Sequence, residues 1–456
     1  MSEYILGLDI GSVEIRAIIA KKENGLENNL SICGIGKSKT YGVKKGVITN
    51  IEQAANSIKL AVSDAVKSAG RKYDRVIVSI SGAYTKSVPS QGVISVPDHE
   101  IGITEIKRAM QMAEHNANVP SDYVKLHILP YDFKVDEQDH IEDPLGMSGN
   151  RLEVSTHIVI VPESSVKNLT KSVEMAGIKI DNIVLSGYAS AISTLSKDEK
   201  ELGVALIDMG GATCDMVVHL GNSLRYNDVL PIGSTNITND LSKAIHTPLP
   251  YAEEIKLSYE DLLIEGKREI ELPVLGEDEK THSVSLEIIT NVILARIEET
   301  IMLLARKLDE SGFKDKIGAG IVLTGGMTKL EEDVRDLATA IFDNISIRIA
   351  KPRNVSGLYE IAKDSANSCA IGLCLYGFGE FTPYEIDSNG ELRYKDEVIK
   401  PSLNSNDIYA KEIATAIDSE NNKEVEVGID KHDMTLPKLP EPNILKKFWN
   451  YIKHLF

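Results

Sequence analysis

The stretch LDIGSVEIR, residues 8–16, ends an apolar run with an aspartate and then turns through glycine and serine into a second apolar run. This pattern predicts a β-hairpin with small residues in its turn. The pattern returns at LIDMGGATCD, residues 206–215, and a third strand-to-glycine junction lies at VLTGGMTKL, residues 322–330. A single Asp-x-Gly turn is common, but three junctions in this order predict two related halves that clamp a polyphosphate.

The composition sets limits on the class of protein. The chain has 456 residues, 42% apolar and 26% charged, which is enough for several domains with sizeable cores. Its 68 acidic and 50 basic residues give a net charge of −18, so we expect no nucleic acid partner. Because no apolar run reaches the roughly 20 residues of a spanning helix and no basic segment opens a signal peptide, we expect neither export nor membrane spanning.

The four cysteines predict structural thiols in a reducing compartment. They form no CxxC pair, and Cys369 and Cys374 flank a small-residue stretch, CAIGLC, that is typical of a buried helix.

The three junctions resemble the phosphate-1, phosphate-2 and adenosine motifs of the actin, sugar-kinase and chaperone superfamily. This resemblance implies an α/β, actin-like ATPase fold with ATP and Mg in a cleft between two halves. Asp9 and Asp208 would orient Mg²⁺ through water. The turns would hold phosphates and the third junction would pack against adenosine, and the residues so implied are Gly11, Ser12, Val13, Gly210, Gly211, Ala212, Thr213, Gly325, Gly326 and Met327.

Two further features bear on the nucleotide. Glu253 and Lys256 have the Glu-x-x-Lys spacing that meets ribose and adenine in the superfamily; the alternative is a solvated ion pair one helical turn apart. Ser186 lies on the loop that positions water in hydrolysing members. A serine orients water less well than Glu or Gln, so we expect ATP binding with slow or negligible hydrolysis.

The middle of the chain narrows the resemblance to one family. HILPYDFKVD (127–136) and DPLGMSGNRLEV (143–154) are similar to the inserted subdomain of the FtsA family of actin-like bacterial division proteins, as are PRNVSGL (352–358) and AIGLCLYG (370–377). The resemblance covers about residues 3–380. The organisation it implies is a first half at 1–83 and 162–200, an inserted subdomain at 84–161, a second half at 201–231 and 307–381, and a smaller subdomain at 232–306.

The end of the chain has its own pattern. Residues 382–442 are polar and end in clustered prolines, which predicts a flexible linker. Residues 443–456 predict an amphipathic membrane-targeting helix, because apolar side chains gather on one face and lysines on the other. The alternative is a terminal helix docked on its own protein. The residues expected at the membrane are Ile444, Leu445, Phe448, Trp449, Ile452, Leu455 and Phe456, with Lys446, Lys447 and Lys453.

The family resemblance implies a function. It implies a protein that polymerises with itself on the inner face of the cytoplasmic membrane at the division septum, tethers the tubulin-like FtsZ there and recruits other division proteins. The C-terminal peptide of FtsZ would bind at 232–306, where we select Arg296 for an acidic peptide; the alternative is a solvent-facing arginine. A PilM-like pilus-assembly protein and a soluble small-molecule kinase are the alternative functions.

Overall fold

The computed structural model describes residues 3–394, apart from 23–29, 344, 354 and 359–362. The predicted membrane helix at 443–456 and the linker from residue 395 onward lie outside the described residues. Among the residues that are described, no helix is long and apolar enough to cross a membrane.

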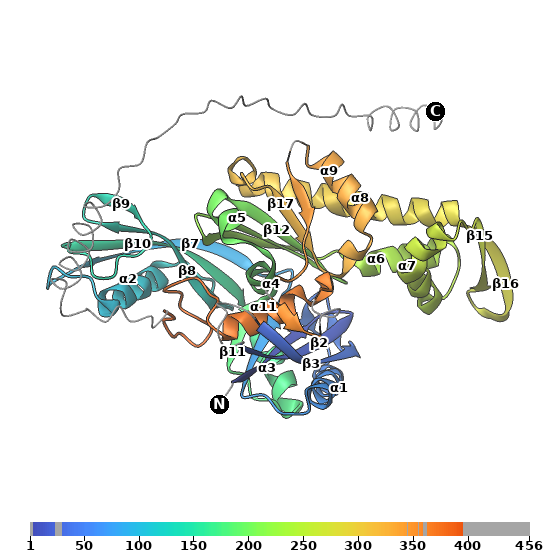
Figure 1. Cartoon of the computed structure of the whole chain (residues 1–456), viewed down its shortest axis with the longest axis horizontal. Coiled ribbons are helices and arrows are strands. Elements are labelled where there is room, and N and C mark those ends of the chain that lie inside the picture. Colours follow the sequence, from blue (N-terminus) through green and yellow to red (C-terminus); the bar gives the residue numbers. More distant parts are fainter. Residues whose placement is uncertain (1–2, 23–29, 344, 354, 359–362, 395–456) are drawn as a thin grey trace, which may run out of the picture. The chain divides into compact units, whose positions relative to one another are not determined.

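Two mixed sheets form the centre of the described chain and share one strand arrangement (Figure 1). In each, an antiparallel meander is followed by two strands parallel to its first strand. The first has the order β11 (Asn182–Leu185), β6 (Arg75–Ile80), β1 (Tyr4–Ile10), β2 (Glu14–Lys22), β3 (Leu30–Lys39) and β19 (Val355–Gly357). The second has the order β14 (Ser223–Leu230), β13 (Cys214–Leu220), β12 (Val204–Met209), β17 (Ile321–Thr324) and β18 (Ile347–Ile349). The prediction of two related halves is confirmed.

The central strands are apolar because helices or the other half cover both their faces. Burial runs through β1 and β12, whereas Asp9 in β1 and Asp208 in β12 are partly exposed. Helix α1 (Ile51–Ala69) covers β2 and β3, begins at Asn50, whose side chain accepts from the Gln53 amide, and ends at Gly70 with φ 66°. Helix α3 (Glu163–Met175) packs beside α1.

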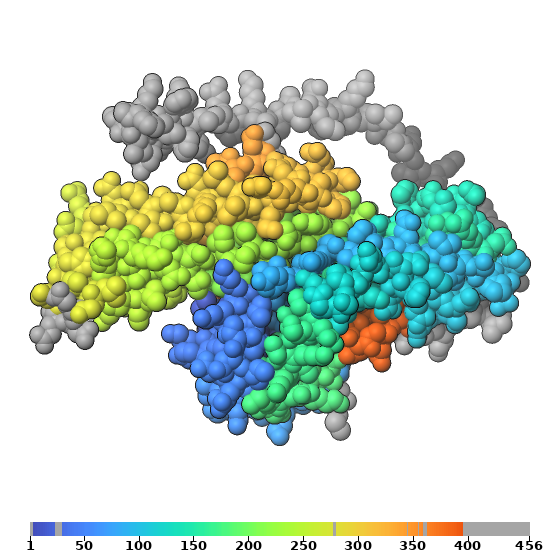
Figure 2. Space-filling view, turned by 180° about the vertical axis from the view of Figure 1, so that it is seen from behind, coloured from blue at the N-terminus to red at the C-terminus, as the bar shows by residue number. Residues whose placement is uncertain are grey.

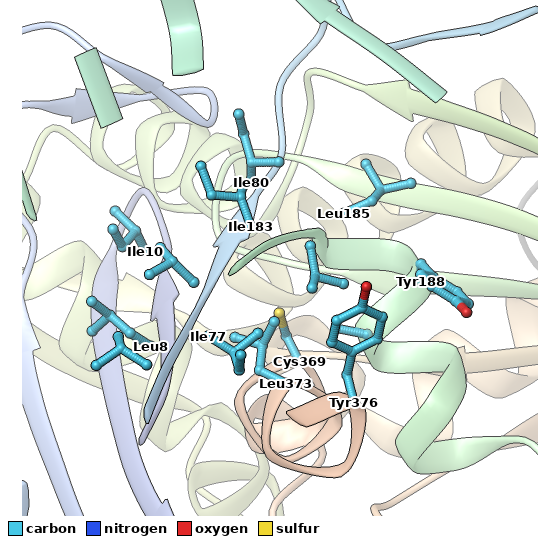
Figure 3. Close-up of a cluster of buried hydrophobic side chains, with 14 of the residues drawn as sticks. Leu8, Ile10, Ile77, Ile80, Ile183, Leu185, Tyr188, Cys369, Leu373 and Tyr376 are labelled. Carbon is cyan, nitrogen blue, oxygen red and sulfur yellow. The ribbon is translucent and has the colours of Figure 1, made fainter. Parts of the chain in front are cut away.

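Two helices join the halves and contact each other closely. Helix α4 (Ser186–Thr194) is buried along almost its whole length, and α11 (Ser368–Gly377) is buried on all sides, as the CAIGLC stretch predicts. A Cβ added to Gly372 of α11 would lie 1.8 Å from the carbonyl oxygen of Ala189 in α4. Figure 3 shows Leu373 and Tyr376 of α11 among apolar side chains of β1, β6 and β11. Glycine at 372 therefore permits this backbone contact.

A subdomain is inserted between β6 and α3. Its sheet has the order β7 (Lys86–Ser95), β10 (Arg151–Pro162), β8 (Tyr123–Val135) and β9 (Gln138–Ile141), and α2 (Ile103–Asn116) packs on β7 and β10. Figure 2 shows this subdomain, light blue to teal, beside the green surface of the second half, and β7, β8 and β10 all contact β14.

A second group of elements lies between β14 and β17. It consists of α6 (Ser234–Ala244), α7 (Leu249–Ile264), the β15 (Glu269–Val274) and β16 (Glu277–Ser285) hairpin, and the long helix α8 (Leu286–Ser311). The shorter elements elsewhere are β4 (Val43–Lys44), β5 (Val47–Ile48), α5 (Lys197–Leu202) and α9 (Glu331–Ile341).

The beginning of the predicted linker is folded onto the body. The backbone of Ile386 pairs with Ile128 of β8, and Glu385 is buried with hydrogen bonds from the hydroxyls of Tyr376 and Tyr188. The guanidinium of Arg393 lies 4.2 Å from the centre of the Tyr376 ring. Residues 382–394 therefore form an ordered strap across the first half and the inserted subdomain, a correction to the prediction that flexibility begins at 382.

Substitution Gly372→Ala tests the contact between α4 and α11. We expect it to lower the free energy of unfolding by about 1–3 kcal/mol, because a methyl group would force two buried helix backbones apart. Urea unfolding followed by circular dichroism measures the change. Lys59→Ala, on the exposed face of α1, is the control. An unchanged midpoint for Gly372→Ala would contradict the packing described here.

Candidate functional site

The three glycine junctions come together between the two sheets. A Cβ on Gly211 would lie 2.3 Å from the Cγ2 atom of Val13, so the turns of the β1–β2 and β12–β13 hairpins touch. A Cβ on Gly325 would lie 2.3 Å from Asp208 Oδ1, and the φ of Gly325 is 96°, which favours glycine. The third junction thus lies against the second. This is the juxtaposition that the spacing of the junctions predicts.

Three aspartates from the two halves face this junction, and each accepts a hydrogen bond from a serine. Ser79 Oγ donates to Asp9 at 2.8 Å, and Ser190 Oγ donates to Asp208 at 2.5 Å. The third aspartate, Asp215, accepts from Ser81 Oγ at 2.7 Å and is the register partner of Asp208 across the β12–β13 hairpin.

Burial and mutual repulsion make ionisation of these carboxyls unfavourable. Burial raises the pKa of Asp9, although the hydrogen bond from Ser79 opposes the shift. Burial, together with the charge on Asp9, raises the pKa of Asp208 to about 6. Burial and the neighbouring charges of Asp208 and Asp9 raise the pKa of Asp215 to about 7. The site therefore gains from a positive charge placed among the carboxylates.

The donor set fits a hydrated magnesium ion. Carboxylate oxygens are the ligands that Mg²⁺ prefers, and it usually keeps several of its waters and binds few protein groups directly. Among the described residues, no group of three or more His, Cys, Asp or Glu side chains closes around a common point. Asp9 and Asp208 thus suit contacts to a metal through water better than an all-protein cage.

Cationic side chains from both halves lie beside the site. Arg16 is the register partner of Asp9, so both side chains project from the same face of the sheet. Its guanidinium donates to Asn367 Oδ1 at 2.8 Å and pairs with Glu14 at 2.5 Å. Lys329, which follows the third junction, pairs with Asp364 at 3.0 Å.

The turn at 210–213 is supported from behind by α6. The amides of Ser234 and Thr235, at the first turn of α6, donate to the carbonyl oxygens of Gly210 and Gly211 at 3.1 and 2.8 Å. A Cβ on Gly233 would lie 2.6 Å from the carbonyl carbon of Gly211. Glycines therefore allow α6 to rest directly on this turn. Ala212, at the next position, is partly exposed.

Glu253 and Lys256 belong to this support. Lys256 Nζ lies 2.7 Å from Glu253 Oε2 and 3.0 Å from Thr238 Oγ1 of α6. The side chain of Lys256 is only 7% exposed. The pair is therefore packed between α6 and α7, which excludes a fully solvated ion pair.

The remaining predicted residues occupy different environments. Met327 is buried in the core of the second half, so its side chain contributes to that core. Ser186 is buried at the first position of α4, one helical turn before Ser190. Gly326 begins a short 3-10 helix, and Ser12 Oγ accepts from the Gly46 amide at 2.8 Å. Thr213 Oγ1 lies 3.4 Å from Asp215.

Sequence reasoning missed the serines and the third aspartate. Asp215 stands at the end of the second junction, but without a register for the hairpin nothing marks it as a neighbour of Asp208. Ser79 and Ser81 lie two residues apart at the end of β6, so their side chains share one face. This spacing is the one feature of the sequence that marks them as a pair. Ser190 carries no comparable signal.

Arg296 lies away from this junction, on α8. Its Nε atom lies 2.5 Å from Asp240 of α6, and its Nη1 atom lies 2.5 Å from Glu299 one turn along α8. The side chain is 21% exposed, and its guanidinium is held by these two ion pairs.

The fold defines a class of protein. The chain is similar to a chain in a solved structure titled "PilM-PilN type IV pilus biogenesis complex", with TM-score 0.59 and 17% identity over 82% of this chain and 98% of that one. Together with the two matching sheets, this likeness defines the actin-like ATPase fold, and the predicted fold class is confirmed.

Sequence comparison identifies the family. Residues 82–160 match the family described as "SHS2 domain inserted in FTSA", and 205–372 match "Cell division protein FtsA". The chain is 40% identical to the Helicobacter pylori strain J99 protein named "Cell division protein FtsA", over 89% of this chain and 88% of that protein. It is 31% identical to the Escherichia coli K12 protein of the same name, over 87% and 94% of the two chains. The chain belongs to the FtsA family of cell division proteins.

The raised pKa values predict how stability depends on pH in the absence of Mg²⁺ and nucleotide. Between pH 4 and 7 the folded site binds more protons than the unfolded chain, whose aspartates titrate near 3.8. The free energy of unfolding therefore falls as pH rises through the folded pKa values of about 6 and 7.

Substitution Asp215→Asn removes one of the titrating groups, so we expect a smaller fall in melting temperature between pH 5 and 8. Differential scanning fluorimetry across that range measures the difference from the unsubstituted protein. Asp98→Asn, at an exposed position, is the control. Parallel curves for Asp215→Asn and the unsubstituted protein would contradict the assignment.

Proposed function

We propose that the chain binds Mg-ATP between its two halves and acts as a nucleotide-dependent membrane tether for FtsZ during cell division. The observation that carries the nucleotide part is the meeting of Asp9, Asp208 and Asp215 beside turns made of small residues. Backbone amides in such turns suit phosphate oxygens, and the carboxylates suit a hydrated cation. Membership of the FtsA family supports the division role.

The named residues have separate tasks in this proposal. The turns 11–13 and 210–213 hold phosphates, Asp9 and Asp208 hold Mg²⁺ through water, and the backbone of 325–327 faces the adenosine while the Met327 side chain packs in the core. When bound, Mg²⁺ supplies positive charge that offsets repulsion among the carboxylates and the phosphates. Glu253 and Lys256 position α6 behind the phosphate turn. Ser186 offers no carboxylate to orient water, so hydrolysis is slow and ATP acts mainly as a conformational ligand.

The membrane part of the proposal rests on the sequence of residues 443–456. Three lysines near an anionic surface contribute about 1 kcal/mol each, and seven apolar side chains on one face add to this. A single short anchor of this kind binds reversibly. Self-assembly multiplies the affinity, because several tails then engage one surface together. The expected site of action is the inner face of the cytoplasmic membrane at the septum.

Liposome binding tests the tether. We expect the purified protein to sediment with anionic liposomes, more strongly with Mg-ATP than without, and the emission of Trp449 to shift to the blue on binding. Deletion of 443–456 should abolish sedimentation in both conditions. Asp208→Ala should sediment with liposomes as the unsubstituted protein does without nucleotide. It should lose the increase in sedimentation with Mg-ATP, because the metal contact is removed.

One control variant and two contradicting outcomes complete this test. Asp98→Ala, at an exposed position, should behave like the unsubstituted protein. Membrane binding that survives deletion of 443–456 would overturn the tether. An increase with Mg-ATP that survives in Asp208→Ala would overturn the assignment of the nucleotide cleft.

The surface of 232–306 has features that suit a bound peptide. Leu257 and Ile264 of α7 are 71% and 83% exposed and lie two helical turns apart, on one face. Ile288 of α8 and Leu275 between β15 and β16 are also exposed. Exposed apolar side chains of this size are typical of recognition surfaces, and Arg296 lies on α8.

Peptide binding tests this surface. Ile264→Glu should weaken binding of the C-terminal peptide of FtsZ at least tenfold in fluorescence anisotropy, because a charge replaces an apolar contact. Arg296→Glu should weaken it as well, through repulsion of an acidic peptide. Leu60→Glu, at a position on α1 that is 61% exposed, is the matched control. Equal affinities for Ile264→Glu and Leu60→Glu would place the peptide elsewhere.

A further inference from the structure

The inserted subdomain contacts the second half through a buried polar cluster. Ser87 of β7 and His157 of β10 meet Asn227 of β14. Ser87 Oγ lies 3.0 Å from Asn227 Oδ1 and accepts a hydrogen bond from the backbone amide of Asn227 at 3.1 Å. His157 Nε2 lies 3.0 Å from the same Oδ1 atom. Beside this cluster, the guanidinium of Arg225 lies 3.7 Å from the centre of the Tyr131 ring.

The same chain segment also reaches the candidate nucleotide site. Ser81, which donates to Asp215, and Ser87, which bonds to Asn227, are the two ends of the segment 81–87, here called the connector, which runs from the end of β6 into the first residues of β7. The connector turns at Gly82, whose carbonyl accepts from the amide and hydroxyl of Thr85 at 3.1 and 2.9 Å. The connector is thus fixed to the second half at both ends.

The partners of the connector lie on one rigid hairpin. Asp215 and Val217 alternate along β13 and share a face, and Val217 is the register partner of Asn227 in β14. Asp215 at the cleft and Asn227 at the inserted subdomain are therefore carried by the same face of the β13–β14 hairpin. Movement of this hairpin relative to β6 must act on both contacts together.

The cluster is built in a way that lets it open. Among the described residues, Asn227 Nδ2 has no hydrogen-bond partner. The same holds for both ring nitrogens of His219, which lies two positions beyond Val217 on the same face of β13. A buried polar group without a partner destabilises the arrangement that buries it. Water can reach Asn227 Nδ2 once the inserted subdomain moves away from β14, so this unpaired atom favours opening of the contact.

We propose that the connector 81–87, held to the β13–β14 hairpin by the Asp215–Ser81 and Asn227–Ser87 contacts, couples nucleotide occupancy of the cleft to the orientation of the inserted subdomain. The inference rests on the proposed nucleotide function and names a regulation of that site. A nucleotide that draws the halves together tightens both contacts and fixes the subdomain. Loss of the nucleotide loosens both contacts, and the inserted subdomain can then change its orientation.

Hydrogen exchange on the full chain, with and without Mg-ATP and in the absence of lipid, tests the coupling. In the unsubstituted protein, Mg-ATP should slow exchange in the turns 11–13 and 210–213 and also in β7 and α2 of the inserted subdomain. Ser87→Ala should keep the slowing in the turns and lose it in β7 and α2. Asn227→Ala removes the Oδ1 contacts to Ser87 and His157 but leaves the backbone amide and carbonyl of residue 227 bonded to Ser87 Oγ, so it should give a smaller loss than Ser87→Ala.

Ser90→Ala is the matched control, because Ser90 also lies on β7 but donates to Ala113 within the inserted subdomain. It should retain the full response. If β7 and α2 do not respond in the unsubstituted protein, or still respond fully in Ser87→Ala, the coupling is wrong while nucleotide binding stands. If the turns themselves show no change with Mg-ATP, the proposed nucleotide function fails first.

Discussion

The crossing of α4 and α11 is the constraint on which the rest of the described structure depends. Gly372 lets the two helix backbones touch at Ala189, and this fixes the distance between the two sheets. The same helices make polar contacts with the second sheet, because Ser190 bonds to Asp208 in β12 and the Ser368 hydroxyl lies 2.7 Å from that of Thr324 in β17. The positions of the carboxylates follow from this packing.

Buried carboxylates are costly, and their cost explains why the site suits a charged ligand. Burial raises the pKa values of Asp9, Asp208 and Asp215; the charge of Asp9 adds to the shift at Asp208, and the charges of Asp208 and Asp9 add to that at Asp215. Serine hydroxyls offset part of that cost. A cation bound through water would offset more, so stability and ligand binding are linked at one place in the molecule.

Much of the local structure could be predicted from the sequence. The hairpin predicted around residues 8–16 is formed by β1 and β2, and the buried helix predicted for the CAIGLC stretch is α11. Apolar and small residues at short spacing mark both segments. The strap at 382–394 was mistaken for linker, since its polar residues satisfy their hydrogen bonds only through distant partners such as Asn182, which bonds to Asp387.

The sequence by itself determined the paired junctions, the two related halves, the family and the periodic elements, because these depend on residue types at short spacing. It also supplied the prediction of the nucleotide residues and of the membrane-targeting tail. Only the tertiary structure decided that Asp215 joins Asp208, that Ser81 and Ser190 bridge the two halves, and that Asn227 meets Ser87. Strand register and packing set those contacts, and neither is encoded in a short stretch of sequence.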